Sequence, residues 1–428
     1  MRNSLVALTF LLFFVPSGLE AQSPTDTLSI TKKIYIASRL YFAVQKYFAH
    51  WGDVPKLDFE ASYKQYLDEA LTAQDRRSFT LASSAFLVRL GNSHTVFLDK
   101  VLQDDAVGPQ PFQARYLRGQ WVVVQSAQKG LEPGDVVTEI DGKPFDDFYK
   151  EVAKYISAST DRFRRRQLFS AWWSYLLPKK YTLTIAGPKR ILVDRSGNSI
   201  AETQSETTGR LVDNGRIGYI RVPSWLDKKF QSRALELLNE YKSAKGIIID
   251  IRGNAGGSTP SSFVRAFMDR PWKWWAESTP MSFSLFSYYA ESGRDGFSSF
   301  ARPSMSWPAG VNQGDSTYSG PLVILIDEGT HSASEDFTMP FKESHRAILI
   351  GDTTAGSTGQ PYFEQLGEGF SFVIGAKREW FPDGSRFEGI GIQPDILVLP
   401  TPDHLKSGKD DELQKAVEVI ETEIAGRH

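Results

Sequence analysis

Ser332 stands where a buried strand is expected to turn into a helix. The apolar run from Leu322 to Ile326 predicts the strand, and residues 333–344 predict the helix. A hydroxyl on such a turn is held rigidly, and the unpaired N–H groups of the first helical turn point toward any negative charge that forms beside it. This placement suits a nucleophile. It also suits a plain helix N-cap, with Glu335 completing a capping box, so partners elsewhere in the chain must decide.

His94 is the histidine that could serve such a serine. It lies in the segment Asn-Ser-His-Thr that follows a predicted helix at 76–90. An imidazole can accept a hydroxyl proton near neutral pH, although a histidine just after a helix is also a common surface or capping residue. His331 adjoins Ser332, but neighbouring side chains diverge, so we expect it to shape the turn. The other histidines end a helix or stand in polar, solvent-like contexts: His50, His345, His404 and His428.

Two glycines could provide an oxyanion-binding backbone. Gly256 and Gly257 lie in the segment Arg-Gly-Asn-Ala-Gly-Gly-Ser, directly after a predicted strand at 246–251. The segment lacks the Gly-Lys-Ser/Thr ending of a phosphate-binding loop. Glycines let backbone N–H groups approach a ligand closely, and such groups can stabilise an oxyanion. The chain shows no metal-ligand spacing such as His-Glu-x-x-His, so neither a metal nor a cofactor is expected.

The elements that must position these groups come from several parts of the chain. Apolar residues recur at steps of three and four between Ile30 and Arg89, which predicts a helical N-terminal region. Strand patterns dominate residues 111–187, and alternating strands and helices typical of an α/β domain begin at Arg216. The expected limits are a leader at 1–21, a helical region at 22–105, a β-rich domain at 106–205, a catalytic α/β domain at 206–400 and a C-terminal helix at 401–428.

Two aromatic-rich segments have no clear assignment from pattern alone. Residues 155–177 are expected to form a helical insertion that packs and does no chemistry. Residues 271–317 interleave Trp, Phe and Tyr with Ser, Gly and Pro, so a plain helix is not expected there. This second segment could be a flap or pocket wall over the site, a subunit contact or ordinary core.

Length, charge and cysteine usage exclude several classes. A chain of 428 residues predicts two or three domains, and its 41% apolar and 23% charged residues are ordinary for a globular protein. The formal net charge of −2, without a long basic run, gives no reason to expect a nucleic-acid or anionic-membrane partner. The absence of cysteine excludes disulfides, thiolate metal sites and a cysteine nucleophile.

The first 21 residues resemble an export signal. Arg2 precedes an apolar run from Leu5 to Val15, and a small-residue cleavage zone ends near Ala21. Such a run is too short to span a bilayer. We therefore expect a periplasmic or secreted protein without stable membrane insertion after cleavage; a non-cleaved anchor is the alternative.

A PDZ-like piece lies within the β-rich domain. Residues 131–142, Leu-Glu-Pro-Gly-Asp-Val-Val-Thr-Glu-Ile-Asp-Gly, resemble the turn, strand and Asp-Gly turn of a PDZ domain. The carboxylate-binding loop usual in such domains is not evident near Phe112. The module could therefore capture peptide or serve architecture alone.

Four motifs in one order resemble a known enzyme family. They are Ser-His-Thr after a helical region, the PDZ-like piece, Asp-Ile-Arg-Gly-Asn-Ala-Gly-Gly, and Ser-Ala-Ser-Glu before a Glu-Gly-x-Gly-x-x-Pro-Asp ending. Together they resemble the tail-specific, or C-terminal processing, serine peptidases over roughly residues 30–425. The resemblance implies a crotonase/ClpP-like α/β catalytic domain and serine-dependent cleavage of peptide bonds.

Within that family the tricorn-like branch fits better than the serine–lysine branch. Ser357 occupies the place where the lysine of the Ser–Lys type would be expected, and Lys342 lies about three helical turns from the serine. The tricorn-like branch implies Ser332 as nucleophile, His94 as base and Glu388 as its carboxylate partner. Ser93 would orient the imidazole, and the N–H groups of Ala333 and of Gly256 or Gly257 would bind the oxyanion.

Two other classes of function stay open at this point. Some relatives of the fold have lost catalysis and carry hydrophobic ligands, as the interphotoreceptor retinoid-binding protein does. A PDZ scaffold with a vestigial catalytic domain would bind peptide without cleaving it. The expected partner is a peptide or protein substrate, and the sequence leaves room for a homo-oligomer.

Overall fold

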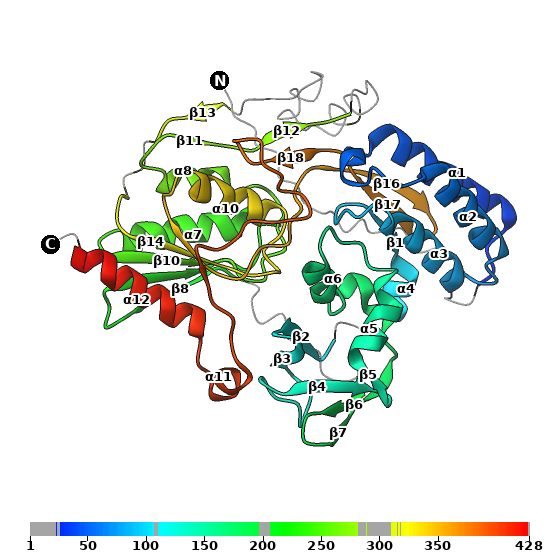
Figure 1. Cartoon of the computed structure of the whole chain (residues 1–428), viewed down its shortest axis with the longest axis horizontal. Coiled ribbons are helices and arrows are strands. Elements are labelled where there is room, and N and C mark those ends of the chain that lie inside the picture. The colour runs from blue at the N-terminus through cyan, green and yellow to red at the C-terminus, as the bar shows by residue number, and fades with distance from the viewer. Residues whose placement is uncertain are drawn as a thin grey trace.

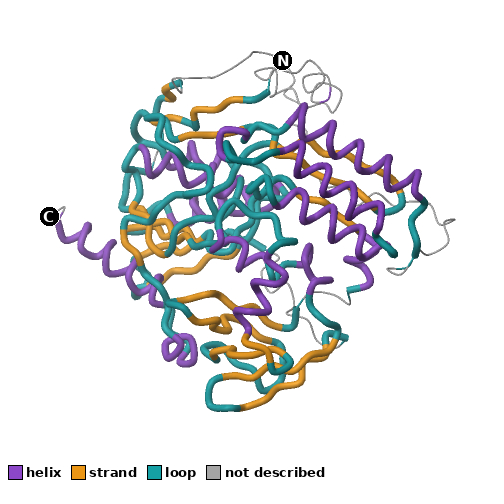
Figure 2. The backbone as a smooth tube through the Cα atoms, turned by 45° about the vertical axis from the view of Figure 1, so that its right-hand side comes forward, coloured by secondary structure: helices purple, strands orange, loops and turns teal. Residues whose placement is uncertain are grey.

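The computed structural model describes residues 23, 26–106, 110–196, 206–280, 288, 310–314, 316 and 318–426. The predicted leader at 1–21 and most of the aromatic segment 271–317 lie outside the described residues. Three groups of elements meet around the middle of the molecule: a helical N-terminal group, an antiparallel sheet and a mainly parallel α/β sheet (Figure 1). Figure 2 shows the N-terminal helices lying over strands of their own sheet, separate from the strands of the α/β part.

The N-terminal helices cover a sheet that is built mostly from the far end of the chain. Ser29, Asp58 and Asp75 cap the three helices by accepting hydrogen bonds from first-turn N–H groups. Their apolar faces share a core with Phe370 and Phe372 of the sheet beneath. The elements are α1 (Ile30–Tyr47), η1 (Trp51–Asp53), α2 (Phe59–Thr72), α3 (Arg76–Val88), β1 (Val96–Asp99), β16 (Pro361–Gly367) and β17 (Phe370–Gly375), with sheet order β1-β17-β16.

The second group is an antiparallel sheet with its own apolar core. Trp121 and Phe112 lie at its centre, packed against the helices that cover it. Its elements are β2 (Phe112–Leu117), β3 (Gln120–Ser126), β4 (Val136–Ile140), β5 (Lys143–Pro144), α5 (Phe145–Ala153), α6 (Asp161–Gln167), η2 (Ala171–Leu176), β6 (Lys180–Ile185) and β7 (Lys189–Asp194). The short helix α4 (Lys100–Asp105) joins it to the N-terminal group.

The third group is a six-stranded sheet in the order β19-β15-β14-β10-β9-β8, parallel except at β8. Strand residues alternate between two cores: Ile247 and Ile249 face one, and Ile248 faces the other. The first core lies under α7, α8 and α10, and the second under α12. The elements are β8 (Thr208–Val212), β9 (Ile217–Arg221), α7 (Lys228–Tyr241), β10 (Gly246–Asp250), α8 (Ser261–Phe267), β14 (Leu322–Ile326), α10 (Ala333–Glu343), β15 (Ile348–Gly351), β19 (Ile396–Leu397), α11 (Pro402–Ser407) and α12 (Asp411–Gly426).

Register brings two loops to the same edge of this sheet. Asp250 of β10 pairs with Leu325 of β14, so both parallel strands end side by side. The loop that follows β10 holds the two candidate glycines, and the turn that follows β14 ends at Ser332. Ligands of open α/β sheets bind outside the carboxyl ends of the strands, which makes this edge the first place to look for a site.

Several predicted elements are confirmed. The strand at 322–326 and the helices near 59–72, 76–88, 333–343 and 411–426 are present. Residues 370–380 form two strands of different sheets, because β17 ends at Gly375 and β18 (Arg378–Trp380) pairs with β12 (Ala276–Ser278). Within the described part of the aromatic segment, β11 (Trp272–Lys273) pairs with β13 (Val311–Asn312), and Trp272 and Trp275 are buried in the α/β core.

The limits predicted for the domains stay predictions. β16 and β17 fall inside the range assigned to the catalytic domain, yet they complete the sheet beneath the N-terminal helices.

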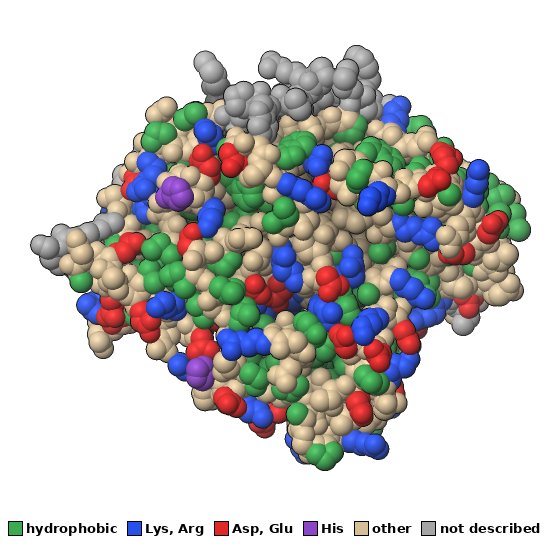
Figure 3. Space-filling view, viewed as in Figure 1, with side chains coloured by type: hydrophobic (Ala, Val, Ile, Leu, Met, Phe, Trp, Pro, Cys, Tyr) green, Lys and Arg blue, Asp and Glu red, His purple; other side chains and the backbone are tan. Residues whose placement is uncertain are grey.

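Among the described helices, none combines the length and apolar character needed to cross a bilayer. Acidic and basic side chains are intermixed over the face seen in Figure 3.

Candidate active site

Ser332 is held on a strained turn between β14 and α10. Its φ of 56° and ψ of −123° lie in a region that L residues rarely adopt. Asp327 fixes the turn, because its carboxylate accepts the N–H of Gly329 at 2.9 Å and that of Gly253 at 2.7 Å. The second bond ties the nucleophile turn to the glycine loop. The turn therefore positions one hydroxyl rigidly at the carboxyl edge of the sheet.

His94 meets this hydroxyl from the N-terminal group. Its Nε2 lies 3.0 Å from Ser332 Oγ, although the two residues are 238 positions apart in the chain. The backbone around the imidazole is anchored by Asn92, whose Oδ1 accepts the N–H of His94 and the hydroxyl of Thr95, each at 3.0 Å. Thr95 Oγ1 accepts the N–H of Gly375 at 3.0 Å, which ties this loop to β17.

Ser357, and not Ser93, contacts the other side of the imidazole. His94 Nδ1 lies 3.1 Å from Ser357 Oγ. The expectation that Ser93 orients the ring is therefore wrong, because the Ser93 hydroxyl lies 3.1 Å from that of Ser159 and accepts the N–H of Ser159 at 2.9 Å. The residue that stands in the place of the lysine of the Ser–Lys type thus lies directly against the imidazole.

Glu388 closes the group of side chains around the imidazole. It is buried, and its Oε1 accepts from Asn92 Nδ2 at 2.9 Å and from Ser159 Oγ at 2.8 Å. Burial raises the pKa of the Glu388 carboxyl, while a positive His50 and the hydroxyls of Ser357 and Ser159 lower it. Glu388 therefore reaches Ser93 only through Ser159, and it interacts with Ser357, the serine that lies against His94 Nδ1.

The oxyanion-binding residues expected from sequence are only partly available. Among the described residues, the N–H groups of Ala333 and Gly257 have no hydrogen-bond acceptor, whereas the N–H of Gly256 donates to Asn254 Oδ1 at 3.0 Å. Gly256 is thus engaged in holding the loop, which leaves Gly257 as the donor of the two expected glycines. A Cβ on Gly256 would lie 2.8 Å from Ser332 Cβ and 2.9 Å from the Ala333 nitrogen, so glycine is required for this close approach.

Glu335 holds the loop that carries Ser357. Its buried carboxyl accepts from the N–H of Gly356 at 2.7 Å, from the N–H of Ser357 at 3.1 Å and from Thr354 Oγ1 at 2.5 Å. It also accepts the N–H of Ser332 at 3.2 Å, which is the backward half of the predicted capping box. Burial raises the pKa of Glu335 to about 8. One side chain therefore fixes both hydroxyls that face His94.

His331 lies in the site, contrary to the expectation that its side chain diverges from it. Its ring stacks on His94 at 4.8 Å between centroids and on Phe163 at 4.4 Å. The positive φ of Ser332 turns the chain sharply, which lets both neighbouring side chains reach the same imidazole. Burial lowers the pKa of His331 to about 4, so this ring is neutral near pH 7. His331 acts as an uncharged wall beside the imidazole of His94.

Sequence reasoning missed several of these residues for a common reason. Ser159, Thr160 and Phe163 belong to the segment 155–177, which was expected only to pack. Thr160 caps α6 and also donates to the Ala355 carbonyl at 2.7 Å, next to Ser357. Only tertiary contacts reveal these roles. The one sequence signal that pointed to this part of the site was Ser357, which stands where the Ser–Lys type has its lysine.

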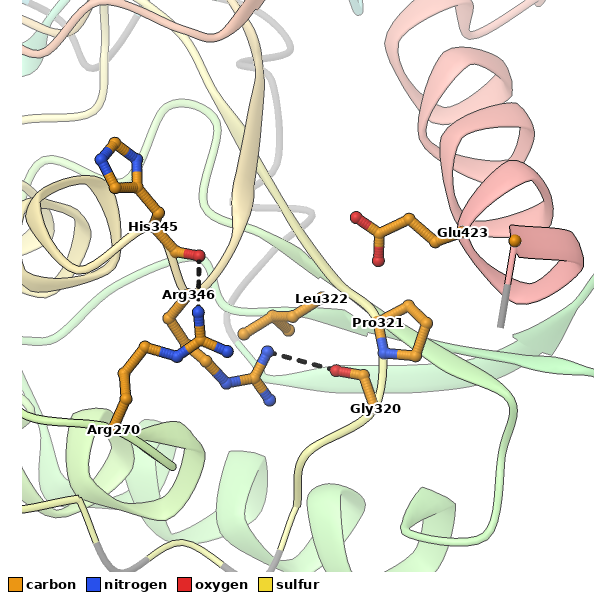
Figure 4. A pocket seen from close by; sticks show the side chains of 8 residues that line it. Arg270, Gly320, Pro321, Leu322, His345, Arg346 and Glu423 are labelled. Carbon is orange, nitrogen blue, oxygen red and sulfur yellow. Dashed lines mark hydrogen bonds between the residues drawn. The ribbon is translucent and has the colours of Figure 1, made fainter. Parts of the chain in front are cut away.

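Two hollows lie outside this cluster. The larger, of about 360 Å³, is at the amino end of β14, where Arg270 donates to the His345 carbonyl and Arg346 to that of Gly320 (Figure 4). Because Ser332 follows the carboxyl end of the same strand, this hollow is not part of the site. The smaller, of about 200 Å³, is lined by Arg115, Tyr116, Asp161, Arg162, Arg165, Arg166, Glu328 and Asp352. Within the described residues, no group of three or more His, Asp or Glu side chains is placed to hold a metal.

Comparisons with known proteins agree with this architecture. Residues 216–398 match the model of "Peptidase family S41", and residues 120–201 match "Bacteroidetes, Peptidase, S41 family, N-terminal domain". A carboxyl-terminal-processing protease of Synechocystis sp. is 25% identical over 307 residues, 70% of this chain and 64% of that protein. The chloroplastic carboxyl-terminal-processing peptidase 3 of Arabidopsis thaliana is 23% identical over 62% of this chain and 47% of that protein. The chain thus spans less than two thirds of the length of these curated relatives.

Solved structures confirm the predicted fold class. The crystal structure of mature CPAF superposes with a TM-score of 0.70 at 14% identity, over 91% of this chain and 96% of that one. The photosystem II D1 C-terminal processing protease gives a TM-score of 0.53 at 18% identity, over 91% and 97%. At such identities the likeness concerns the fold: a multidomain α/β protein with a helical N-terminal region and β-rich sheets.

Proposed function

We propose, from its membership of peptidase family S41 and from the geometry of its site, that this chain is a serine peptidase that cleaves peptide bonds with Ser332 and His94. One observation carries the proposal. Ser332 Oγ lies 3.0 Å from His94 Nε2, at hydrogen-bond distance between a nucleophile and its base. A serine that was only a helix N-cap would have no need of a buried imidazole at this distance.

In the proposed mechanism, His94 Nε2 accepts the proton of Ser332 while Oγ attacks the carbonyl carbon of the peptide bond. The N–H groups of Ala333 and Gly257 stabilise the oxyanion that forms. When the C–N bond breaks, the imidazolium gives its proton to the leaving amine. Water then attacks the acyl-enzyme with His94 again as base, which releases the carboxylic acid and restores Ser332.

Ser357 and Glu388 support the imidazole in this scheme. With Nε2 free to accept, the remaining ring proton sits on Nδ1 and is donated to Ser357 Oγ. In this scheme the Ser357 hydroxyl, which lowers the pKa of Glu388, donates onward to the carboxylate, whose negative charge stabilises the imidazolium. The glutamate thus acts through a bridging hydroxyl, in place of the direct His–carboxylate contact of better-known triads.

A lysine base is disfavoured on two grounds. Lys342 forms an ion pair with Asp395 on the far end of α10. Lys377 lies near enough for its charge to lower the pKa of His94, but it is buried in an ion pair with Glu277 at 3.0 Å and with Glu379. These carboxylates raise the pKa of Lys377, so that it stays protonated and cannot accept a proton from serine.

The substrate class and the cellular compartment are proposed from the similar proteins and from the leader-like residues, and not from the geometry of the site. The similar proteins are named carboxyl-terminal-processing peptidases, so we propose that the substrates are peptides or proteins cleaved near their C-termini. The leader-like residues 1–21 and the match of residues 120–201 to a bacterial S41 N-terminal domain support an exported enzyme.

The experiment that tests this proposal is covalent labelling with a fluorophosphonate, which reacts only with activated serines. The protein is incubated with the probe and with fluorescently labelled casein in parallel, and the modified residue is located by peptide mass spectrometry. We expect hydrolysis of casein and a single adduct on Ser332. A protein that binds ligand without catalysis would give neither product, and an adduct on another serine would overturn the assignment.

Replacing Ser357 by alanine should weaken catalysis without abolishing it. The change removes a hydrogen bond to a group that becomes charged, worth about 1.5 to 3 kcal/mol, so kcat should fall by about 10- to 150-fold. Steady-state kinetics on casein measure the effect, with Ser385→Ala as a control on an exposed turn serine whose hydroxyl donates to Asp383. An unchanged kcat would mean that the imidazole is oriented by another group.

The pH profile should reflect a base that stays neutral in mildly acidic solution. Burial of the ring and the nearby charge of Lys377 hold the pKa of His94 well below the usual 6.5. The base is active only when neutral, so kcat/KM should stay constant as pH falls through 6.5 and should decline only below it. A profile of kcat/KM between pH 4 and 8 checks this, and a midpoint at or above 6.5 would contradict it.

A further inference from the structure

One buried histidine beside the site has no role in the mechanism above. His50 is 1% exposed and follows α1, directly before the short helix η1. Its Nδ1 lies 3.5 Å from Asp53 Oδ2, and neither ring nitrogen has a hydrogen-bond partner within the described part of the chain. Burying an imidazole whose nitrogens make no hydrogen bonds costs free energy. If this residue served only to fill the core, an apolar side chain would be more stable there.

The His50 ring lies next to the residues that hold Glu388. A Cβ built on Gly375 would lie 3.3 Å from His50 Cδ2 and 2.5 Å from Asn92 Oδ1, so the imidazole and the amide cover the same glycine side by side. Ala49 N–H donates to the Gly375 carbonyl at 2.9 Å, which fixes the ring's place over β17. Asn92 is the residue that donates to Glu388 Oε1.

Glu388 has one oxygen that these contacts leave over. Oε1 accepts from Asn92 and Ser159, whereas Oε2 is buried and makes no hydrogen bond within the described residues, although the Ser357 hydroxyl lowers the pKa of the same carboxyl. His50 Nε2 is likewise buried and without a hydrogen-bond partner among the described residues. Both groups adjoin Asn92, since the imidazole and the amide cover the same glycine and the amide binds the carboxylate.

Asp53 anchors the far side of His50. Its Oδ1 accepts from Arg378 at 2.6 Å and lies 3.4 Å from Arg386 Nε. Although burial opposes it, the nearby His50 ring and the charge of Arg378 lower the pKa of Asp53, so this carboxylate is ionised near neutral pH. With Nδ1 facing Asp53, Nε2 is the ring nitrogen on the other side of the imidazole, and it has no partner within the described residues.

We infer that His50 is a positioning residue for Glu388: the buried imidazole, anchored by Asp53, supports the Asn92 amide and the carboxylate that this amide binds. The N-terminal helical group thereby contributes two histidines to the site, one acting on Ser332 and one acting on the glutamate behind it. This inference rests on the proposed function, because it assigns His50 to the support of the same imidazole.

The test uses two amides that each mimic one ring nitrogen. In His50→Gln the amide stands near the place of Nε2, and in His50→Asn it stands near that of Nδ1. The rate of labelling by a fluorophosphonate is measured over a range of probe concentrations, which separates kinact from KI. We expect His50→Gln to keep at least about a third of the wild-type kinact and His50→Asn to lose about tenfold, with KI within twofold in both. If His50 acted only through its contact with Asp53, His50→Asn would keep the higher kinact and His50→Gln would lose it. That result would overturn the inference.

A double-mutant cycle with Glu388→Gln decides whether the effect passes through the glutamate. We expect His50→Asn to change kinact by less than about twofold once Glu388 is replaced, since coupled residues are not additive. The same tenfold loss in both backgrounds would overturn the inference. Melting temperatures are recorded for every variant, and His404→Asn, which changes a partly exposed histidine bonded to Asp411, should leave kinact unchanged.

The outcomes for this inference and for the proposed function are distinguishable. If wild-type protein gives no adduct on Ser332, the proposed function fails before His50 is considered. If wild-type protein is labelled at Ser332 and His50→Asn is labelled at the wild-type rate, only the inference about His50 fails.

Discussion

Replacing Ser332 by alanine is expected to lower kcat by about 10⁵- to 10⁶-fold, because the variant keeps the site but has no atom to attack the carbonyl. The residual rate would come from the oxyanion-binding N–H groups and from substrate binding alone. Turnover of labelled casein at high enzyme concentration measures the loss, and KM should change little because the hydroxyl contributes little to ground-state binding.

The Ser332→Ala variant should fold normally. Its backbone N–H still donates to the Ser357 carbonyl and to Glu335, each at 3.2 Å. Alanine and serine both carry a Cβ, so the strained φ of 56° costs the two residues about the same. The matched control is Ser334→Ala, two positions along, whose buried hydroxyl has no hydrogen-bond partner within the described residues. Loss of activity in Ser334→Ala with normal turnover in Ser332→Ala would refute the assignment of the nucleophile.

The parts of the fold that sequence predicts best are those fixed by local pattern. The run Leu322–Ile326 can only be a buried strand, and Ser332 with Glu335 is a strong helix start, so β14 and α10 appear with nearly the expected ends. The pairing of β1 with β17 could not be predicted in this way. It joins segments more than 270 residues apart, and no period in either segment encodes its partner.

The same distinction separates the predicted from the unpredicted site residues. Motif order suggested His94, Ser332 and Glu388, which the structure brings together around one imidazole. The bridging hydroxyl could not be chosen from sequence, because Ser93 and Ser357 are the same residue type and both lie close to the site. Their roles differ only because Ser159 binds Ser93, while Glu335 fixes the backbone of Ser357. Such choices depend on tertiary hydrogen bonds.

Replacing His94 by alanine is expected to cost about as much as loss of the serine, some 10⁵- to 10⁶-fold in kcat, since the hydroxyl of Ser332 then has no base. Because nucleophile and base act as one unit, the double variant Ser332→Ala with His94→Ala should be no slower than either single variant. His331 cannot substitute, since its buried ring stacks flat on that of His94 and points no nitrogen at Ser332 within hydrogen-bond distance.

Two measurements make the His94 prediction specific for a histidine base. Lys342→Met, which breaks the ion pair with Asp395 at the other end of α10, should leave kcat within about twofold, since surface ion pairs contribute little. Imidazole added to His94→Ala should restore part of the activity, with a rate that rises as more of the added base is neutral. Full activity in His94→Ala, or a loss in Lys342→Met as large as that in Ser332→Ala, would instead indicate a lysine-dependent enzyme. Because Ser332 has no hydrogen-bonded ammonium group within the described residues, the geometry favours the histidine.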